Sequence, residues 1–338
     1  MTPISPEERQ RVRDLLEVLT RTKSVSGSED EIASFLENVL EDFGYSVKRE
    51  KNNVLVNPNK NLIVTAHMDT VPIKREFSLD AAYAYGTGSC DDKASITAIL
   101  EALREIEELN FGIALFYDEE ENGTGSMEYA HRYRPKMAVV MEPTSLNVAS
   151  THYGSLEVIV RARGISAHGA HPEKGINAIE ECIKFYYHVK SIPGIMSSMQ
   201  MIRGGSDELV IPERCEGRIE VLFPPEIKSR DVIGAIVRGI SHTISIEIKD
   251  SYDGTYSRRV DRLLEKALMS IGLIPKRAVM KSWTDALNLA KVGCDVVVWG
   301  PGELYRCHTE KERVSIDEIV IAKRALVALN KIVREEEC

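Results

Sequence analysis

Runs of consecutive apolar residues recur along the chain and predict buried strands. They lie at residues 62–64, 113–117, 137–140 and 296–298. A strand that is buried on both faces has this pattern, because neither of its faces needs polar side chains. Between the runs, residues 32–43 repeat their apolar positions with the 3.6-residue period of a helix, and residues 96–106 are also predicted to be helical. The alternation predicts an α/β fold in which a three-layer domain surrounds a mostly parallel sheet.

The first amphipathic helix carries signals at both of its ends. Ser28-Glu29-Asp30-Glu31 matches a capping box, in which a serine and a glutamate three residues later bond to each other's backbone amides. Gly44 follows the last apolar position and predicts a left-handed stop. We therefore expect this helix to begin after Ser28 and to end before Gly44.

The pattern changes after about residue 154. Ile244, Ile246 and Ile248 alternate with polar residues, as in a strand with one solvated face. Two further segments, 156–162 and 218–223, also resemble strands, and 176–189 is predicted to be a helix. We therefore predict an α+β domain over residues 154–256. It is inserted into an α/β domain of residues 1–153 and 257–338, whose pattern resumes with helices at 263–271 and 316–333.

The composition narrows the classes of protein that this chain can represent. Its 338 residues are 43% hydrophobic and 28% charged, which is typical of a globular protein with two domains. The net charge of −9, with no basic stripe, argues against a nucleic-acid or anionic-membrane partner. No apolar run is long enough to span a bilayer, and the acidic start lacks an apolar signal core, so we expect a cytoplasmic protein.

Six cysteines are spread along the chain without a Cys-x-x-Cys pair. They are Cys90, Cys182, Cys215, Cys294, Cys307 and Cys338. This spacing predicts reduced thiols rather than a disulfide framework. A zinc site built only from thiolates is not expected.

Three of the predicted strands end at side chains that can bind a cation. His67 and Asp69 follow the first strand, Glu119 and its acidic neighbours follow the second, and Glu142 follows the third. Ligands of open α/β sheets gather at the carboxyl ends of strands, so these groups should meet there. Asp91, in a glycine-rich turn before a helix, would add another carboxylate. So many like charges repel one another unless protons or cations intervene.

The mixture of imidazole and carboxylate groups favours zinc over magnesium or calcium, with cobalt or manganese as possible substitutes. Each motif also has an ordinary explanation. His67-x-Asp69 occurs by chance, residues 118–121 can form a solvated loop, and Glu142-Pro143 can simply begin a loop. Gly86-x-Gly88 can be a tight turn, and it lacks the third glycine of a dinucleotide fingerprint. A metal centre explains all four motifs together, because they occur in order at successive strand ends.

Six ordered motifs lie between residues 67 and 312, and the resemblance that they carry covers about residues 15–330. They are His67-Met68-Asp69-Thr70-Val71-Pro72, Gly86-x-Gly88-x-x-Asp91-x-Lys93, Asp118-Glu119-Glu120, Glu142-Pro143-Thr144, Gly164-x-x-Ala167-His168 with Asn177, and Thr284-Asp285-Ala286 followed by Gly300-Pro301-Gly302 and His308-Thr309-x-x-Glu312. Together they resemble the dinuclear-zinc aminoacylase and carboxypeptidase family. That family includes acetylornithine deacetylase, succinyl-diaminopimelate desuccinylase and glutamate carboxypeptidase.

The resemblance implies that each chain binds two zinc ions, for which cobalt is a possible substitute. Asp91 would bridge the two ions. His67 and Glu142 would complete the coordination of one ion, and Glu120 and His308 that of the other. The chain would then be a dinuclear zinc amidohydrolase.

The resemblance also implies the catalytic groups. Glu119 would be the general base, Asp69 would orient His67, and His168 would donate a hydrogen bond to the oxyanion. In relatives this last histidine reaches the active site of the partner subunit. A homodimer is therefore expected, with residues 154–256 as its lid and dimerisation domain.

The acidic run Glu119-Glu120-Glu121 leaves one question of register open. The base and the metal ligand can be either the first pair or the second pair of these residues. An ungapped match through Gly125-Ser126 favours Glu119 as the base and Glu120 as the ligand.

Two departures from the family pattern concern substrate recognition. Leu209 stands where relatives carry an asparagine before Val-Ile-Pro, and Glu220-Val221-Leu222 stands where many have Asp-x-Arg. In relatives these residues of the lid help to hold a substrate carboxylate. The resemblance therefore leaves substrate recognition by this chain undefined.

The short chain and Lys281-Ser282-x-Thr284-Asp285 resemble the branch that releases lysine or ornithine in amino-acid biosynthesis. The substrate would be N-acetyl-lysine or N-acetylornithine, or either amino acid bound to an acidic amino-group carrier protein. Lys174, Arg203 and Arg214 are candidates for a basic patch that meets such a carrier, although they can equally be solvated charges. A dipeptidase, carboxypeptidase or succinyl-diaminopimelate desuccinylase is the alternative within the family. The alternative from another functional class is a non-catalytic relative that keeps the fold for binding or scaffolding, and such a protein would be expected to have lost metal ligands.

Overall fold

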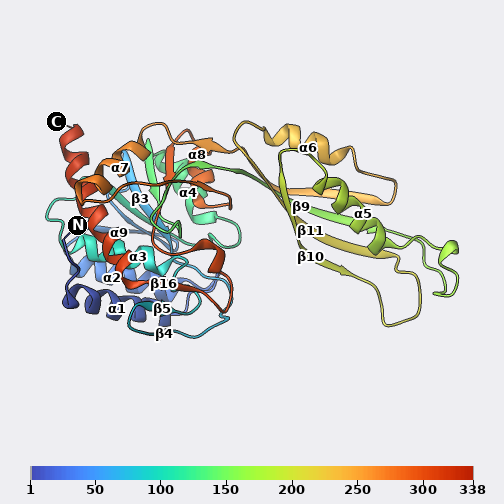
Figure 1. Cartoon of the computed structure of the whole chain (residues 1–338), viewed down its shortest axis with the longest axis horizontal. Helices are drawn as coiled ribbons and strands as arrows, with labels where there is room; N and C mark the ends of the chain where they lie inside the picture. The colour runs from blue at the N-terminus through green and yellow to red at the C-terminus, as the bar shows by residue number, and fades with distance from the viewer. Residues whose placement is uncertain (1, 338) are drawn as a thin grey trace. The chain divides into compact units, whose positions relative to one another are not determined.

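The computed structural model describes residues 2–337, which form two compact units (Figure 1). The first unit takes in the chain up to Thr151, Tyr256–Met280 and the chain from Thr284 onward. The second unit consists of His152–Thr255 and Lys281–Trp283. Each unit has its own apolar core and is described separately below.

The first unit is built on a nine-stranded sheet. Its strands, in their order across the sheet, are β1 (Val47–Glu50), β2 (Asn53–Val56), β6 (Gly112–Phe116), β3 (Leu62–His67), β7 (Met137–Val140), β15 (Asp295–Val298), β8 (Val148–His152) and β13 (Thr255–Tyr256), and β14 (Arg277–Met280) also pairs with β8. The four strands β6, β3, β7 and β15 are parallel to one another. Antiparallel pairing extends the sheet beyond β6 and beyond β15. The predicted mostly parallel sheet is therefore confirmed.

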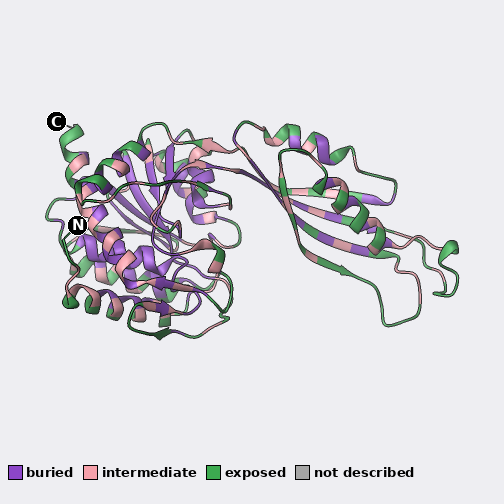
Figure 2. Ribbon diagram, viewed as in Figure 1, coloured by how far each residue is buried: buried purple, intermediate pink, exposed green. Residues whose placement is uncertain are grey.

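Helices cover both faces of this sheet. One face carries α1 (Pro6–Arg21), α2 (Asp30–Asp42), α3 (Lys93–Leu103), α7 (Val260–Ser270) and α9 (Ile316–Glu337), and the other carries α4 (Thr124–Tyr133) and α8 (Asp285–Lys291). Successive strand residues point to opposite faces, so Leu62 and Val64 join the first core while Ile63 joins the second. The central strands are buried on both sides, as Figure 2 shows in purple. The three-layer prediction is confirmed.

The predicted capping box is wrong, although the helix itself forms. In α2 the N-cap residue is Glu29, and no side chain caps the helix. The Glu29 carboxylate instead accepts a hydrogen bond from the backbone amide of Gly27 at 2.9 Å. The other end agrees with the prediction, because Gly44 has a φ of +86°.

The second unit is an antiparallel sheet with helices on one face. Its strands are β10 (Met196–Gly204), β11 (Arg214–Phe223), β9 (Gly154–Arg163) and β12 (Ile244–Tyr252), in that order. Helices α5 (Ala178–Lys190) and α6 (Ser229–Val237) pack on the apolar face. The other face carries mostly charged side chains, and the strands therefore alternate in burial (Figure 2).

Shorter elements complete the chain. A three-stranded antiparallel sheet consists of β16 (Arg313–Ser315), β5 (Tyr83–Tyr85) and β4 (Ser78–Leu79). Two 3-10 turns are η1 (Pro172–Lys174) and η2 (Leu304–Arg306). Within residues 2–337 no helix has the length and apolar character needed to cross a membrane.

Five of the six cysteines lie within the described part of the chain, and all five are free thiols, as predicted. They are Cys90, Cys182, Cys215, Cys294 and Cys307, and each is buried. Cys338 lies outside the described residues.

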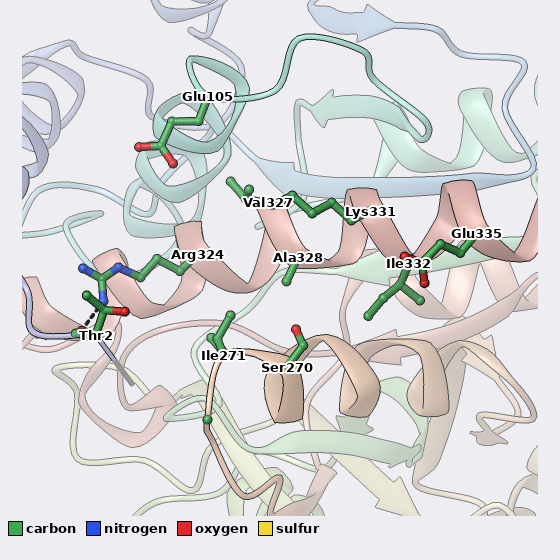
Figure 3. Close-up of a pocket in the computed structure, with 11 residues that line it drawn as sticks. Thr2, Glu105, Ser270, Ile271, Arg324, Val327, Ala328, Lys331, Ile332 and Glu335 are labelled. Carbon is green, nitrogen blue, oxygen red and sulfur yellow. Dashed lines mark hydrogen bonds between the residues drawn. The ribbon is translucent and has the colours of Figure 1, made fainter.

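A partly buried ionic cluster joins the N-terminal helix α1 to the C-terminal helix α9. Glu8 accepts hydrogen bonds from Arg324 at 2.7 Å and from Lys323 at 3.2 Å. Burial alone would raise the pKa of Glu8, but Arg324, the backbone amide of Ser5 and Lys323 outweigh it and lower that pKa to about 2. Arg324 also donates to the backbone carbonyl of Thr2, at one end of a surface cavity of 870 Å³ beside α9 (Figure 3).

This cluster predicts how stability should depend on pH. Because the folded-state pKa of Glu8 lies below its ordinary value of 4.5, its contribution is complete above pH 4.5 and is lost as the pH falls through about 2. We expect Glu8→Gln to lower the free energy of unfolding by about 1–2 kcal/mol at pH 7 and by much less near pH 2. Urea unfolding at a series of pH values measures this. The exposed neighbour variant Glu7→Gln is the control, and a constant difference between wild type and Glu8→Gln at every pH would contradict the prediction.

Candidate metal centre

The carboxyl ends of β3, β6 and β7 lie side by side and carry the predicted groups. In the register of the sheet, His67 of β3 is level with Phe116 of β6, and Thr65 is level with Val140 of β7. The segment containing Glu119 and Glu120 begins directly after β6, and Glu142 lies two residues after β7. These side chains therefore start from one edge of the sheet, as the strand-end argument predicted.

The structure brings the five predicted metal ligands into two groups that share one residue. The first group is His67, Asp91 and Glu142, and the second is Asp91, Glu120 and His308. Within each group the candidate ligand atoms all lie within 4.8 Å of one another. Such spacing suits side chains around a single ion.

The two oxygens of Asp91 face different groups. Oδ1 lies 3.0 Å from Nε2 of His67, and Oδ2 lies 3.3 Å from Nε2 of His308. Nε2 of His308 also lies 2.9 Å from Oε1 of Glu120. A carboxylate with one oxygen toward each group has the arrangement needed to bridge two cations.

The charges at this site also fit two cations. Burial raises the pKa of Glu142 well above its ordinary value, and the charges of Glu119 and Asp91 raise it further. Burial likewise raises the pKa of Glu119. Buried carboxylates that repel one another in this way are stabilised when divalent cations lie between them. The donor set of two imidazoles and three carboxylates matches what zinc accepts in proteins.

The histidines respond to the same negative charge. Hydrogen bonds to Asp91 and Glu120 raise the pKa of His308 to about 10. Burial would lower the pKa of His67, but the charge of Glu119 and the hydrogen bonds with Asp69 and Asp91 raise it well above 6.5. Burial would also raise the pKa of Asp91, and the two histidines outweigh it and hold that pKa below its ordinary value. The negative charge of the carboxylates that raises these pKa values would also attract cations.

Asp69 contacts more residues of the site than the sequence indicated. Its Oδ1 lies 3.4 Å from Nδ1 of His67, and its backbone carbonyl oxygen lies 3.1 Å from the same nitrogen, so the predicted orienting role of the carboxylate stays a prediction. It also accepts hydrogen bonds from the backbone amides of Glu119 and Glu120, each at 3.0 Å, and from the hydroxyl of Ser26 at 2.7 Å. One buried carboxylate therefore contacts both His67 and the acidic segment.

The three glutamates of the acidic run, residues 119–121, have different surroundings. Glu120 lies in the second ligand group, and Glu119 is buried, which raises its pKa well above the ordinary value even though the charge of His67 opposes this shift. Glu121 is exposed and lines a different surface cavity with Arg49 and Lys51. This geometry favours Glu119 and Glu120 as the base and ligand, and the two roles stay predictions.

Backbone geometry at the site is unusual at two non-glycine residues. His308 has a φ of +61° and Asp118, just before Glu119, also has a φ of +61°. The left-handed region costs a non-glycine residue about 1–3 kcal/mol, so the surrounding contacts must hold these segments in place. Gly88 has a φ of +79°, and a Cβ there would lie 2.5 Å from Cγ2 of Thr70, so the turn before Asp91 requires glycine.

His168 lies in the second unit, on a loop after β9. It is exposed, its backbone pairs with Val210, and its Nδ1 accepts a hydrogen bond from the backbone amide of Ala170 at 3.1 Å. Its predicted role stays a prediction.

Two buried acids in the motifs had no role assigned from the sequence. Glu312 accepts hydrogen bonds from the backbone amides of Cys90 and Asp91. Asp285 is buried with one carboxylate oxygen unpartnered, and burial raises its pKa to about 7. The sequence indicated only that each of these two motifs contains an acidic residue. It gave no indication of the contacts that the residue makes.

The thiols beside the ligands are packing groups. Cys90 and Cys307 are buried, and neither belongs to a metal-binding group among the described residues. A Cβ on Gly302 would lie 2.2 Å from Sγ of Cys90, which shows how closely the thiol is packed.

The cavity beside α9 in Figure 3 is lined by none of the five predicted ligands.

The basic residues proposed from the sequence separate in the structure. Arg203 and Arg214 line a cavity of 610 Å³ in the second unit, together with Arg161 and Arg163. Lys174 lies in η1 and is not among the residues that line it. Leu209, which replaces the asparagine of relatives, is 85% exposed. Glu220 accepts a hydrogen bond from Gln200 at 3.0 Å.

Comparison with known proteins identifies the family. The model of the peptidase family M20/M25/M40 matches residues 63–331. A LysW-lysine/LysW-ornithine hydrolase of Sulfurisphaera tokodaii is 25% identical over 325 residues, which cover 93% of each chain. An acetylornithine deacetylase of Salmonella paratyphi B is 25% identical over 353 aligned positions, covering 88% of this chain and 91% of that protein.

A solved structure shares the fold. The YxeP protein of Bacillus subtilis, a dinuclear metal binding peptidase of the M20 family, superposes with a TM-score of 0.70. The match covers 98% of this chain and 99% of that one at 13% identity. The family model spans well over half of the present chain, and the described residues include two groups of side chains that could each hold a metal ion. The chain therefore belongs to the peptidase family M20/M25/M40 and is a hydrolase of its dinuclear metal type.

Proposed function

We propose that the chain is a dinuclear zinc amidohydrolase that releases lysine or ornithine from an N-acyl form. The observation that carries the proposal is the pair of ligand groups that share Asp91, with the buried Glu119 carboxylate beside them. His67, Asp91 and Glu142 would hold one zinc ion, and Asp91, Glu120 and His308 the other. Cobalt is a possible substitute, because it accepts the same donors.

Bound zinc would polarise the amide carbonyl and lower the pKa of water toward about 7. Glu119 accepts the proton of the attacking water, which its buried carboxylate can do because its pKa is raised. Asp69 keeps Glu119 in place through the backbone amide. Glu119 then passes the proton to the leaving amine, and in the proposed homodimer His168 of the partner subunit donates a hydrogen bond to the oxyanion.

The relatives support the choice of substrate. One is a LysW-lysine/LysW-ornithine hydrolase and another is an acetylornithine deacetylase, and both cover most of this chain. Both names refer to derivatives of lysine or ornithine. We therefore propose N-acetyl-lysine, N-acetylornithine, or lysine or ornithine joined to an acidic amino-group carrier protein.

A cluster of arginines in the second unit supports an acidic carrier. Arg163 and Arg214 lie directly opposite each other on adjacent strands, where like charges repel. Arg161 pairs with Glu216 at 2.8 Å and with Glu247 at 2.9 Å. Within residues 2–337 neither Arg163 nor Arg203 has a side-chain ion pair, so these guanidinium groups are available to acidic groups of a partner.

The test is a panel of substrates with two equivalents of zinc. It contains N-acetyl-lysine, N-acetylornithine, succinyl-diaminopimelate, several dipeptides and lysine in amide linkage to an acidic carrier. We expect the highest kcat/KM on a lysine or ornithine amide. Turnover of dipeptides or succinyl-diaminopimelate alone would favour those alternatives, and two bound metals without turnover of any compound would favour a binding protein.

The same experiment also tests whether the arginine cluster binds the carrier. If the carrier-bound form is the substrate, Arg203→Glu/Arg214→Glu should lower kcat/KM for it about tenfold, through slower association. Activity on N-acetyl-lysine should stay the same. Arg218→Glu, on β11 but outside the cavity, is the matched control. Equal losses on both substrates would contradict a docking role.

We also propose a homodimer formed through the second unit. Strand β10 is the edge of its sheet, so its outer backbone groups can pair with another strand. Exposed apolar side chains lie on and near this edge, including Met196 and Ile202 on β10 and Tyr187 on α5. Light scattering should give the mass of two chains, and the mass of one would contradict the proposal.

A further inference from the structure

Glu312 connects the turn that carries Asp91 to the loop that carries His308. Its Oε1 accepts hydrogen bonds from the backbone amides of Cys90 at 3.1 Å and Asp91 at 3.3 Å. Its backbone carbonyl accepts one from the amide of Gly86 at 3.4 Å. A single residue therefore contacts both ends of the turn over residues 86–91.

The same residue is tightly linked to His308. Glu312 lies four positions after it, and the amide of Glu312 donates to the carbonyl of Thr309 at 3.2 Å, which closes the intervening turn. Directly after Glu312, Arg313 of β16 pairs with Tyr85 of β5, and Tyr85 precedes the Asp91 turn. The two loops are thus joined on either side of Glu312.

The contacts explain why an acceptor is needed here. Glu312 is 1% exposed, so water cannot replace its carboxylate as the partner of two backbone amides. Asp91 must keep one oxygen toward each ligand group, and a small movement of its backbone would withdraw one of them. Glu312 itself belongs to neither ligand group.

We propose that Glu312 is a positioning residue of the metal centre. It holds the amides of Cys90 and Asp91 so that the Asp91 carboxylate stays between the two groups, and it keeps the His308 loop in register with that turn. The inference rests on the proposed bridging role of Asp91. Partners that orient ligands from behind commonly change metal affinity 10–100-fold when they are removed.

The test compares three variants by titrating the metal-free protein with Co²⁺ and following its visible absorption. Glu312→Ala removes the acceptor, Glu312→Asp withdraws it by one methylene group, and Glu312→Gln keeps an oxygen at the same place. We expect Glu312→Ala to weaken Co²⁺ binding about 10–100-fold and to change the spectrum. Glu312→Asp should show a smaller loss, and Glu312→Gln should bind within about threefold of wild type, because its amide oxygen can accept the same two hydrogen bonds.

Two outcomes would overturn the inference. One is Co²⁺ affinity and a spectrum in Glu312→Ala equal to wild type, and the other is a loss in Glu312→Gln as large as in Glu312→Ala. If Glu312→Ala does not fold, the comparison of Glu312→Asp with Glu312→Gln decides, and equal affinities would overturn it. Asp91→Asn is titrated alongside. If Asp91→Asn still binds two Co²⁺ ions, the proposed centre itself is wrong. If Asp91→Asn loses Co²⁺ binding while Glu312→Ala binds normally, only the role of Glu312 is rejected.

Discussion

Replacing Glu119 with glutamine should leave two metal ions bound and lower kcat by about 10²–10⁴-fold. The amide has the shape of the carboxylate but cannot accept the proton of the attacking water. The substitution also removes no metal ligand, because Glu119 belongs to neither of the two ligand groups. Steady-state turnover and metal content of the dialysed protein measure the two effects separately.

Glu121→Gln is the matched control for this experiment. Glu121 belongs to the same acidic run but is exposed, so its replacement should leave turnover within about twofold of wild type, as surface changes usually do. If Glu121→Gln were the inactive variant and Glu119→Gln the active one, the base would have to be reassigned. Loss of metal from Glu119→Gln would instead place this residue among the ligands.

The second large effect concerns Asp91. Asp91→Asn should remove both tightly bound metal ions, because a neutral amide cannot supply an anionic oxygen to each of two cations. Glu142→Gln should weaken one site, since Glu142 belongs to only one of the two groups. After dialysis against a weak chelator, we expect about two metal ions per chain in wild type, one in Glu142→Gln and none in Asp91→Asn.

Elemental analysis of the three proteins decides this prediction. The metal-free proteins should remain folded, and circular dichroism checks that any loss of metal is not a loss of structure. Equal metal contents in Asp91→Asn and Glu142→Gln would mean that Asp91 binds a single ion. The bridging arrangement would then have to be abandoned.

Much of the first unit was predictable because its signals are local. The apolar runs at residues 62–64 and 137–140 form strands that are covered on both faces. Their apolar composition alone therefore distinguishes them from the solvated parts of the chain. Strand β10 was not predicted, because an edge strand with no fully buried residue lacks such a run. The capping box at Ser28 was wrong because the helix begins one residue later, with Glu29 at the N-cap and its carboxylate bonded to the backbone amide of Gly27.

By itself, the sequence determined the chemical types at the site, since histidines and carboxylates at successive strand ends already imply a cation. It also determined the α/β layering, which follows from the periodicity of buried positions. Only the tertiary structure decided that the two oxygens of Asp91 face different groups, that Asp69 holds the amides of Glu119 and Glu120, and that Glu312 ties two loops together. These contacts join residues that are tens to hundreds of positions apart, and no local pattern records which side chain will meet which backbone amide.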